Sequence, residues 1–344
     1  MGLLDRFFNP AREEVSSMGI ENIKKITVLG QGNMGPDIAL AFALQGFEVT
    51  CVDLLEGQLE LASKRIAWNC RQLVEENVLG VDGAGEIKSR VTFTTQDEPA
   101  IAEADFVMES TPEQIEIKQA VFARCDVLCP AHVIVASGTS SMSIAAISAK
   151  MNHPERAVTA HFTIPAHLSP LVEVVLGEKT SQSTREGILA LLNKAGKHPV
   201  LCKDTPGFLH NYLQAALVGA SLELLEKGIA SAEEIDAVVN YGFGLRLAAV
   251  GPIRFLDMCG LDTVRKVQQY LFSVTRQPVY KSSAVIEAMV QRGDLGVKSG
   301  KGFYEYATRN SQEFWDRTNR TIIRGLRAAG KWPLCAKNSS SNGG

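Results

Sequence analysis

A glycine-rich turn near the start of the chain constrains its fold more than any other stretch. Residues 25–29 are rich in β-branched side chains and predict a strand, and residues 36–45 predict a helix that begins with a proline. The turn between them reads GQGNMG, and a strand, a glycine turn and a helix in this order are the context of a dinucleotide-binding fingerprint. We therefore predict that a dinucleotide lies against Gly30, Gly32, Asn33, Met34 and Gly35.

The strand that follows supplies the second half of this signal. Residues 48–52 predict a strand, and Asp53 ends it eighteen residues after Gly35, where a carboxylate can bind a ribose hydroxyl. Leu54 and Leu55 come next, in place of the arginine that a 2′-phosphate would require, so the pattern favours NAD over NADP. An aspartate that only ends the strand or caps a turn is the alternative interpretation of Asp53.

Composition and charge exclude several classes of protein. The chain has 344 residues, of which 45% are hydrophobic and 21% charged, and this is enough for two domains with apolar cores. A net charge of -3 argues against a nucleic-acid partner and against an anionic membrane surface. The seven cysteines include no CxxC pair, which is typical of a reducing compartment and not of a disulfide framework or a metal site. Because the charged N-terminus lacks a signal-peptide core and no apolar run could span a membrane, we expect a cytoplasmic protein.

Strand and helix patterns alternate through the first part of the chain and stop near Pro206. A long amphipathic helix is predicted over residues 58–80. A hydroxyl cluster at residues 137–141 follows a predicted strand, where open parallel sheets bind ligands, although a turn or a helix cap is the alternative. The predicted fold class is α/β: a Rossmann-type domain with a mainly parallel sheet, followed by an all-α domain. We predict an N-terminal arm over residues 1–22, the Rossmann-type domain over 23–205, the helical domain over 206–330 and a flexible tail over 331–344.

The second part of the chain has mainly helical periodicity. The first of its helices is long and apolar enough to be the spine of a domain and a contact between two subunits. The predicted helices cover residues 209–227, 232–241, 251–259, 262–275, 284–292 and 312–328.

A histidine and a glutamate stand in apolar segments of the first part. His161 ends the run at residues 157–160, and Glu173 lies within the run at residues 171–175, so each is a polar side chain in a predicted buried strand. If the chain turns at the prolines between them, Glu173 can accept a hydrogen bond from one imidazole nitrogen and leave the other free to act on a substrate. A core histidine with an edge carboxylate is the other interpretation of this pair.

Several motifs occur in a fixed order along the chain. They are GQGNMG with Asp53, E-x-x-x-E-x-x-x-x-K at residues 109–118, Thr139-Ser140-Ser141, H-x-x-x-P and P-L-V-E-V within residues 161–175, DTPGF at 204–208 with Asn211, and GVKSGKGFY at 296–304. Together they resemble the 3-hydroxyacyl-CoA dehydrogenase family, which includes a branch with lambda-crystallin, L-gulonate 3-dehydrogenase and carnitine dehydrogenase. The resemblance implies a Rossmann-type domain and a helical domain, an active site in the cleft between them, and a homodimer.

The resemblance also implies a reaction and the residues that carry it. His161 would take the hydroxyl proton of a secondary alcohol while a hydride leaves the same carbon for NAD, and Glu173 would orient His161 and stabilise the imidazolium. Ser140 and Asn211 would hydrogen-bond the reacting oxygen or its neighbour. Glu113 and Lys118, from the 109–118 motif, would contact the cofactor.

Departures from the family pattern concern the substrate. Gly138 stands where the family usually has Asn, and residues 161–165 read His-Phe-Thr-Ile-Pro in place of His-x-Phe-Asn-Pro. Arg246 lies in a segment that resembles the lambda-crystallin and carnitine dehydrogenase branch, where an arginine could pair with a free carboxylate. The alternative is that Arg246 lies on the solvated face of a helix. The 296–304 motif, in contrast to the segment around Arg246, resembles the acyl-CoA branch of the family.

Three functions stay open at this point. The first is NAD-dependent oxidation of a 3-hydroxyacyl-CoA or a 3-hydroxy acid. The second is oxidation of another small carboxylated alcohol or aldehyde, similar to L-gulonate or carnitine, with Arg246 on the carboxylate. The third is a non-catalytic protein that binds NAD, against which the intact set of His161, Glu173, Ser140 and Asn211 argues.

Overall fold

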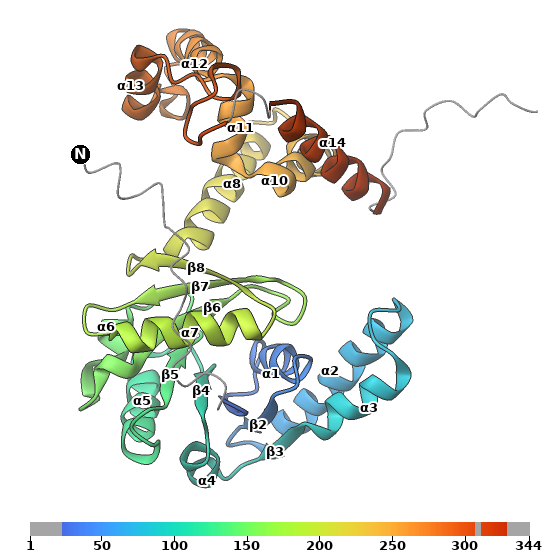
Figure 1. Cartoon of the computed structure of the whole chain (residues 1–344), viewed down its shortest axis with the longest axis vertical. Coiled ribbons are helices and arrows are strands. Elements are labelled where there is room, and N and C mark those ends of the chain that lie inside the picture. The colour runs from blue at the N-terminus through green and yellow to red at the C-terminus, as the bar shows by residue number, and fades with distance from the viewer. Residues whose placement is uncertain (1–22, 307–310, 329–344) are drawn as a thin grey trace, which may run out of the picture. The chain divides into compact units, whose positions relative to one another are not determined.

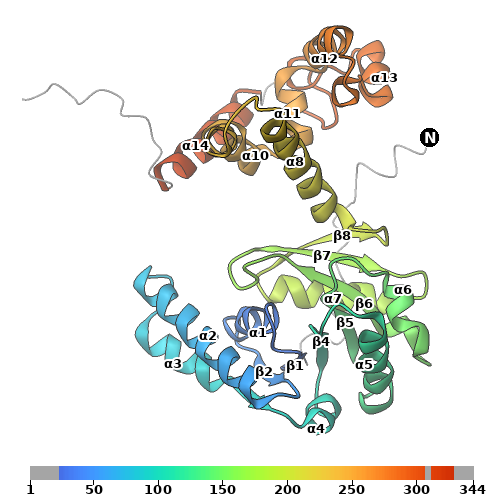
Figure 2. The same ribbon diagram turned by 180° about the vertical axis from the view of Figure 1, so that it is seen from behind.

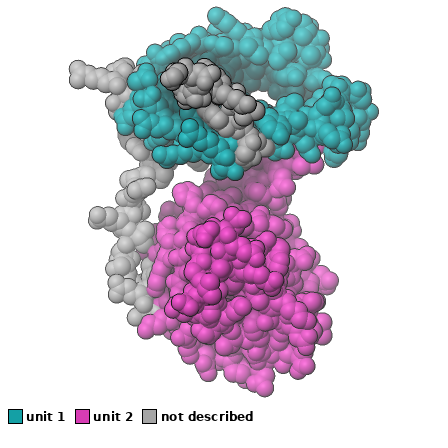
Figure 3. All heavy atoms as spheres, turned by 90° about the vertical axis from the view of Figure 1, so that its right-hand side faces the viewer, with its two compact units in different colours: residues 1–13, 219–344 teal, residues 14–218 magenta. Residues whose placement is uncertain are grey.

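The computed structural model describes residues 23–306 and 311–328. Two compact units divide these residues. Those up to Val218 are called the first unit here (magenta, unit 2 in the key of Figure 3), and those from Gly219 onward the second unit (teal, unit 1 in the key). The division falls inside one long helix, twelve residues beyond the boundary predicted at Pro206. The predicted arm over residues 1–22 and the predicted tail over residues 331–344 lie outside the described residues.

One eight-stranded sheet is the centre of the first unit. Its strand order is β3-β2-β1-β4-β5-β6-β7-β8, and every neighbouring pair is parallel except β6 and β7. A central β1 with strands added on both sides is the doubly wound arrangement, so the predicted mainly parallel Rossmann-type sheet is confirmed. The strands are β1 (Lys25–Leu29), β2 (Glu48–Val52), β3 (Val91–Thr94), β4 (Phe106–Glu109), β5 (Ile134–Ser137), β6 (Ala157–Phe162), β7 (Leu171–Leu176) and β8 (His198–Lys203).

Helices cover both faces of this sheet. One face packs against α1 (Gly35–Ala43), α2 (Glu56–Glu75), α3 (Val81–Ser89) and α7 (Gln182–Lys194), and α7 lies in front of the sheet in Figure 1. The other face packs against α4 (Asp97–Ala102), α5 (Ile115–Leu128) and α6 (Ile144–Ile147), and Figure 2 shows α5 in front. Because both faces are buried, the central strands read as continuous apolar runs and not as alternating ones.

The long helix predicted over residues 58–80 is shorter than expected. The helix α2 ends at Glu75, and a separate helix, α3, follows after a turn. Asn77 has a φ of 57°, and the backbone N–H groups of Val78 and Leu79 both donate to the carbonyl of Leu73, at 2.9 and 3.1 Å. A left-handed residue after the last turn ends a helix in this way, and an asparagine adopts that conformation more readily than most residues do.

The second unit consists of helices. The long helix α8 (Phe208–Glu226) begins in the first unit, and the helices predicted from residue 251 onward agree with the structure to within one residue at either end. The helix predicted over 232–241 is an α-helix followed by a π-helical turn, and α10 after it was not predicted. These elements are α9 (Ala232–Ala237), the π-helix η4 (Val238–Phe243), α10 (Gly244–Val250), α11 (Pro252–Cys259), α12 (Leu261–Thr275), α13 (Ala284–Arg292) and α14 (Ser311–Ala328).

A buried aspartate organises the glycine-rich segment at residues 296–304. Asp257, on α11, accepts hydrogen bonds from the backbone N–H groups of Phe303 and Tyr304 and from the hydroxyl of Tyr306, each at 3.0 Å. Burial, followed by the nearby charge of Asp257, raises the pKa of Tyr306 far above its usual range. The motif therefore has a structural role in this unit, since two of its backbone N–H groups, with the hydroxyl of Tyr306, satisfy one buried carboxylate.

Within residues 23–306 and 311–328, no helix combines the length and the apolar character that crossing a bilayer requires.

Candidate functional site

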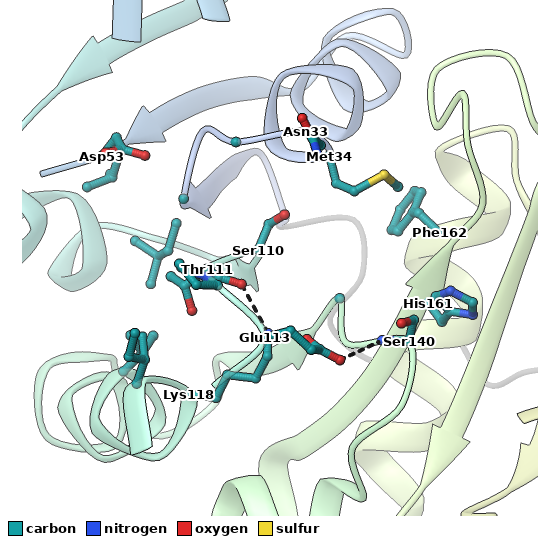
Figure 4. Close-up of a pocket in the computed structure, with 18 of the residues that line it drawn as sticks. Asn33, Met34, Asp53, Ser110, Thr111, Glu113, Lys118, Ser140, His161 and Phe162 are labelled. Carbon is teal, nitrogen blue, oxygen red and sulfur yellow. Dashed lines mark hydrogen bonds and ion pairs between the residues drawn. The ribbon is translucent and has the colours of Figure 1, made fainter. Parts of the chain in front are cut away.

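A large cavity opens at the carboxyl ends of the parallel strands in the first unit. Its volume is about 1410 Å³, and its lining comes from residues that follow β1, β2, β4, β5 and β6, together with the first turns of α8. Asp53 lies at one end of this pocket and His161 and Ser140 lie at the other, with Asn33 and Met34 between them (Figure 4). Ten of the predicted residues line it: Gly30, Gly32, Asn33, Met34, Asp53, Glu113, Lys118, Ser140, His161 and Asn211.

The glycine turn has the geometry that close approach of a phosphate requires. Gly30 has a φ of +92°, and a Cβ atom on Gly35 would lie 2.0 Å from the carbonyl oxygen of Gly30, so neither position accepts a larger residue. A Cβ atom on Gly32 would meet nothing within 4 Å, because Gly32 borders the pocket at the N-terminal end of α1. The open space at Gly32 and the helix N-terminus behind it fit a pyrophosphate.

The carboxylate of Asp53 is held beside the same turn. It accepts hydrogen bonds from the backbone N–H groups of Gln31 at 2.8 Å and of Leu55 at 3.1 Å. Leu54 is 80% exposed and lines the pocket, so no cation stands next to Asp53 at this position. This end of the pocket therefore fits a ribose with a free 2′-hydroxyl better than one with a 2′-phosphate.

His161 and Glu173 are brought together by an antiparallel pair of strands. They are register partners on β6 and β7, and Nδ1 of His161 lies 2.8 Å from Oε2 of Glu173. A carboxylate only accepts hydrogen bonds, so Nδ1 is the donor, and in the neutral imidazole the lone pair is then on Nε2. Both residues are buried, and the predicted turn between their strands is confirmed.

The side chain of Glu173 also accepts hydrogen bonds from the first turn of α8. Its second oxygen, Oε1, accepts the backbone N–H groups of Leu209 at 3.0 Å and His210 at 2.8 Å. These two donors are among the N–H groups that have no partner inside the helix, and the positive end of the helix dipole favours a negative charge there. Three hydrogen bonds therefore fix the orientation of the Glu173 side chain.

Two aromatic side chains next to His161 were not predicted from the sequence. The ring centroid of Phe208 lies 5.7 Å from that of His161, and the ring of His210 lies 6.1 Å away in an edge-to-face arrangement. Phe208 is buried and has a φ of 50°, an uncommon conformation for a residue with a Cβ atom. The only sequence signal for either residue is its position beside Asn211 after the DTPGF motif.

A network of buried charges lies under the middle of the pocket. Nζ of Lys118 is 2.9 Å from Oε1 of Glu109 and 3.2 Å from Oε2 of Glu113, and Lys118 and Glu109 are fully buried. Burial raises the pKa of Glu113, but hydrogen bonds from Thr139 and Ser141 and the charge of Lys118 outweigh it, so the pKa falls below its usual range. Glu113 therefore stays ionised and holds the hydroxyl cluster predicted at residues 137–141.

Ser140 is positioned by two of the other predicted residues. Its backbone N–H donates to Oε1 of Glu113 at 3.3 Å, and its carbonyl accepts Nδ2 of Asn211 at 2.8 Å (Figure 4 shows the first of these). The structure thus brings Ser140, Asn211 and His161 to the same end of the pocket. Hydroxyl, amide and imidazole groups converging on one point are suited to holding a hydroxyl oxygen and accepting its proton.

The segment that joins β6 to β7 is anchored at two places. Nζ of Lys197 donates to the carbonyls of Ala166 at 2.6 Å and Ser169 at 2.9 Å, and burial lowers the pKa of Lys197 to about 8. His167 lies 3.6 Å from Asp37 of α1, which also binds Arg65. These contacts fix the ends of the two strands that carry His161 and Glu173.

The two departures from the family pattern both reach the pocket wall. Gly138 and Ile164 line the cavity, and Ile164 is 75% exposed. A Cβ atom on Gly138 would lie 3.0 Å from Cε of Met108 and 3.1 Å from the carbonyl oxygen of Glu109, so an asparagine there would require the neighbours to move. The wall at this place is therefore wider and less polar than a pair of asparagines would make it.

Arg246 is not one of the residues that line this pocket. It belongs to α10 in the second unit, where its guanidinium stacks 3.9 Å from the ring centroid of Phe255. It is not among the residues that line the cavity of the first unit, and its predicted role with a substrate carboxylate stays a prediction.

Comparisons with known proteins identify one family over residues 25–306. Residues 25–205 match the model of the 3-hydroxyacyl-CoA dehydrogenase NAD binding domain, and residues 207–306 match that of the C-terminal domain. The probable 3-hydroxybutyryl-CoA dehydrogenase of Bacillus subtilis is 35% identical over 292 residues, which is 84% of this chain and 99% of that protein.

Two further relatives are similar over most of their length. The 5-formyl-3-hydroxy-2-methylpyridine 4-carboxylate 5-dehydrogenase of Mesorhizobium japonicum is 32% identical over 305 residues, which is 88% of this chain and 96% of that protein. The crystal structure of a 3-hydroxyacyl-CoA dehydrogenase from Archaeoglobus fulgidus superposes with a TM-score of 0.75 at 30% identity, covering 90% of this chain and 99% of that one.

Proposed function

Because the chain belongs to the 3-hydroxyacyl-CoA dehydrogenase family, we propose that it oxidises the secondary alcohol of a 3-hydroxyacyl-CoA or a 3-hydroxy acid with His161 as the general base. It is an oxidoreductase that acts on CH–OH groups, and NAD is its cofactor. The observation that carries the proposal is the pair of His161 and Glu173, in which Nδ1 is engaged at 2.8 Å and Nε2 is left to accept a proton.

The pocket suits the shape of the cofactor. Asp53 would hold the ribose at one end, the turn with Gly30, Gly32 and Gly35 would hold the pyrophosphate, and Asn33 and Met34 follow along the same wall. Glu113 and Lys118 would contact the part of the cofactor nearest to Ser140. When it is bound, NAD supplies the hydride acceptor.

The protein groups around His161 supply the proton chemistry. Nε2 of His161 takes the hydroxyl proton, and the imidazolium that results is stabilised by Glu173, whose orientation three hydrogen bonds fix. Ser140 and Asn211 hold the substrate oxygen close to Nε2 of His161. Asn211 also fixes the loop that carries Ser140, because its amide donates to the carbonyl of Ser140. The rate increases because His161 and the side chains that hold the substrate oxygen do not have to reorient during the reaction.

A small carboxylated alcohol or aldehyde is the second candidate substrate. It is favoured by the relative from Mesorhizobium japonicum, which is named for a carboxylated aldehyde, and by the apolar wall at Gly138 and Ile164. In this proposal a cation in the second unit, Arg246, would pair with the carboxylate.

We also propose a homodimer. The helix α8 exposes apolar side chains along its length, among them Leu213 at 60% and Leu222 at 51%. Contiguous exposed apolar surface is typical of protein contacts, and a second copy would cover it. Light scattering of the purified protein tests this, and a monomer at micromolar concentration would contradict it.

The substitution His161→Gln tests the proposed reaction. Wild type and variant are supplied with NAD and with 3-hydroxybutyryl-CoA, 3-hydroxybutyrate, L-gulonate or carnitine, and NADH formation is recorded. We expect the variant to bind NAD as the wild type does and to turn over at least ~10²-fold more slowly, as for other enzymes that lose a positioned base. Retained turnover would remove His161 from this role, and no NADH from any of the four substrates would contradict the substrate class.

A further inference from the structure

Two polar side chains of α8 face the pocket and have no partner among the described residues. His210 and Gln214 are four residues apart, so they lie on the same face of the helix, and both line the cavity. Neither side chain makes a hydrogen bond or an ion pair within residues 23–306 and 311–328. A histidine with both ring nitrogens available at the edge of a cavity is free to bind a ligand.

The cations that line the pocket are already engaged. Lys118 is buried between Glu109 and Glu113, and Arg124 binds Asp97 through Nε at 2.7 Å. Among the described lining residues, no other lysine or arginine is present. An anionic group that enters this pocket near His161 would therefore find an imidazole with no other partner in His210.

The position of His210 fits a group that is close to the reacting carbon. Its ring centroid is 6.1 Å from that of His161, and the two rings meet edge to face at an interplanar angle of 68°. Each imidazole reaches a ligand oxygen over about 2.8 Å, so rings this close can both bind one small ligand. A 3-hydroxy acid, with a hydroxyl on one carbon and a carboxylate on the next, is such a ligand.

We propose that His210, assisted by Gln214, binds a substrate carboxylate that is attached to the carbon next to the reacting carbon. The inference rests on the proposed function and narrows its substrate to a small hydroxy acid instead of a thioester. The nearby carboxylate of Glu173 opposes a further negative charge, so a bound carboxylate needs a donor or a cation that balances it. His210 can do so as an N–H donor, because neither of its ring nitrogens is bound to a described residue.

Substitutions at His210 and a matched control on the same helix test the proposal. His210→Leu removes the hydrogen bonding, His210→Gln keeps a neutral donor, and Tyr212→Leu changes a side chain on the same turn that is 72% exposed and does not line the pocket. Steady-state rates with NAD are compared for 3-hydroxybutyrate, its neutral methyl ester and 3-hydroxybutyryl-CoA. The ester keeps the four-carbon hydroxy acid chain, adds one methyl group and has no charge.

The expected result is a loss that depends on the charge of the substrate. His210→Leu should raise the KM for 3-hydroxybutyrate about 10-fold or more, which is the effect of losing a hydrogen bond to a charged group, and should leave the KM for the ester nearly unchanged. The KM of His210→Gln for 3-hydroxybutyrate should lie between those of the wild type and His210→Leu, and the KM of Tyr212→Leu should equal that of the wild type. Equal losses for acid and ester, or a wild type that prefers the thioester over the acid, would overturn the proposal.

A binding measurement separates this proposal from the proposed reaction. Acetoacetate and methyl acetoacetate are titrated calorimetrically into the protein in the presence of NAD, so no turnover is needed. Tighter binding of acetoacetate to the wild type, abolished by His210→Leu, supports the carboxylate site even if no alcohol is oxidised. No preference for acetoacetate over its ester overturns the site and leaves the proposed reaction standing.

Discussion

The substitution Glu173→Gln changes one oxygen of a buried side chain into an amide nitrogen and should remove the proton acceptor of the site. In the wild type, Oε1 accepts the N–H groups of Leu209 and His210 and Oε2 accepts Nδ1 of His161. A glutamine has only one oxygen, so it can satisfy the helix or the imidazole but not both.

The orientation in which the glutamine oxygen accepts the N–H groups of α8 should be the more stable one. If the glutamine oxygen faced His161, its amide group would meet two backbone N–H groups of α8, and two buried donors would lose their acceptor at about 1–3 kcal/mol each. If the oxygen faces α8 instead, the amide donates to Nδ1, and the ring proton moves to Nε2. The nitrogen that faces the pocket would then carry a proton and could no longer accept one.

Turnover should therefore fall sharply while cofactor binding persists. Loss of a positioned base costs about 10²–10⁴-fold, and the corresponding change of the orienting carboxylate to an amide in serine proteases lowers kcat about 10⁴-fold. We expect a kcat loss in that range for Glu173→Gln. Stability should fall by about 1–2 kcal/mol, because two hydrogen bonds to a charged acceptor become hydrogen bonds to a neutral one.

The assay is NADH absorbance at saturating substrate, with the affinity for NAD measured by fluorescence and the free energy of unfolding measured in urea. Glu178→Gln is the control, since Glu178 is exposed beyond the end of β7 and lies outside the pocket. The nitrogen chemical shifts of the imidazole report directly which ring nitrogen carries the proton. A variant that keeps kcat within a factor of about three, or a proton that remains on Nδ1, would refute the tautomer argument.

Two further predictions concern the cofactor end of the pocket and the anchored segment between β6 and β7. Asp53→Asn should raise the KM for NAD about 10-fold, because a charged acceptor for a ribose hydroxyl is lost, and NADH kinetics with Asp82→Asn as an exposed control would show it. Lys197→Met should change how stability depends on pH. Burial lowers the pKa of Lys197 to about 8 from an ordinary value of 10.5, so between these pH values the unfolded chain binds more protons than the folded one. The stability of the wild type relative to Lys197→Met should therefore rise with pH across this window, as measured by urea unfolding at pH 7 to 10.

Each of these predictions has a clear contrary outcome. An unchanged KM for NAD in Asp53→Asn would support the interpretation that Asp53 only ends its strand. A constant stability difference between the wild type and Lys197→Met from pH 7 to 10 would mean that the carbonyls of Ala166 and Ser169 hold the ammonium group at its ordinary pKa.

Much of the cofactor end of the pocket was predictable because its signals are local. A strand, a glycine turn and a helix follow one another within residues 25–43, and backbone sterics demand glycine at Gly30 and Gly35 whatever the rest of the chain does. The end of α2 was less predictable, because an apolar pattern continues past Asn77 while the backbone turns there. Periodicity reports which side chains are buried, and it does not report where a helix changes direction.

The substrate end depends on contacts that the order of residues along the chain does not specify. The sequence alone determined the class of fold, the dinucleotide turn and the candidate pair of His161 and Glu173, since each follows from local spacing and burial. Only the tertiary structure decided that Glu173 also caps α8, and that Phe208 and His210 lie against the imidazole. The physical reason is that these groups come from strands and a helix more than thirty residues apart, which meet only when the sheet and α8 are packed.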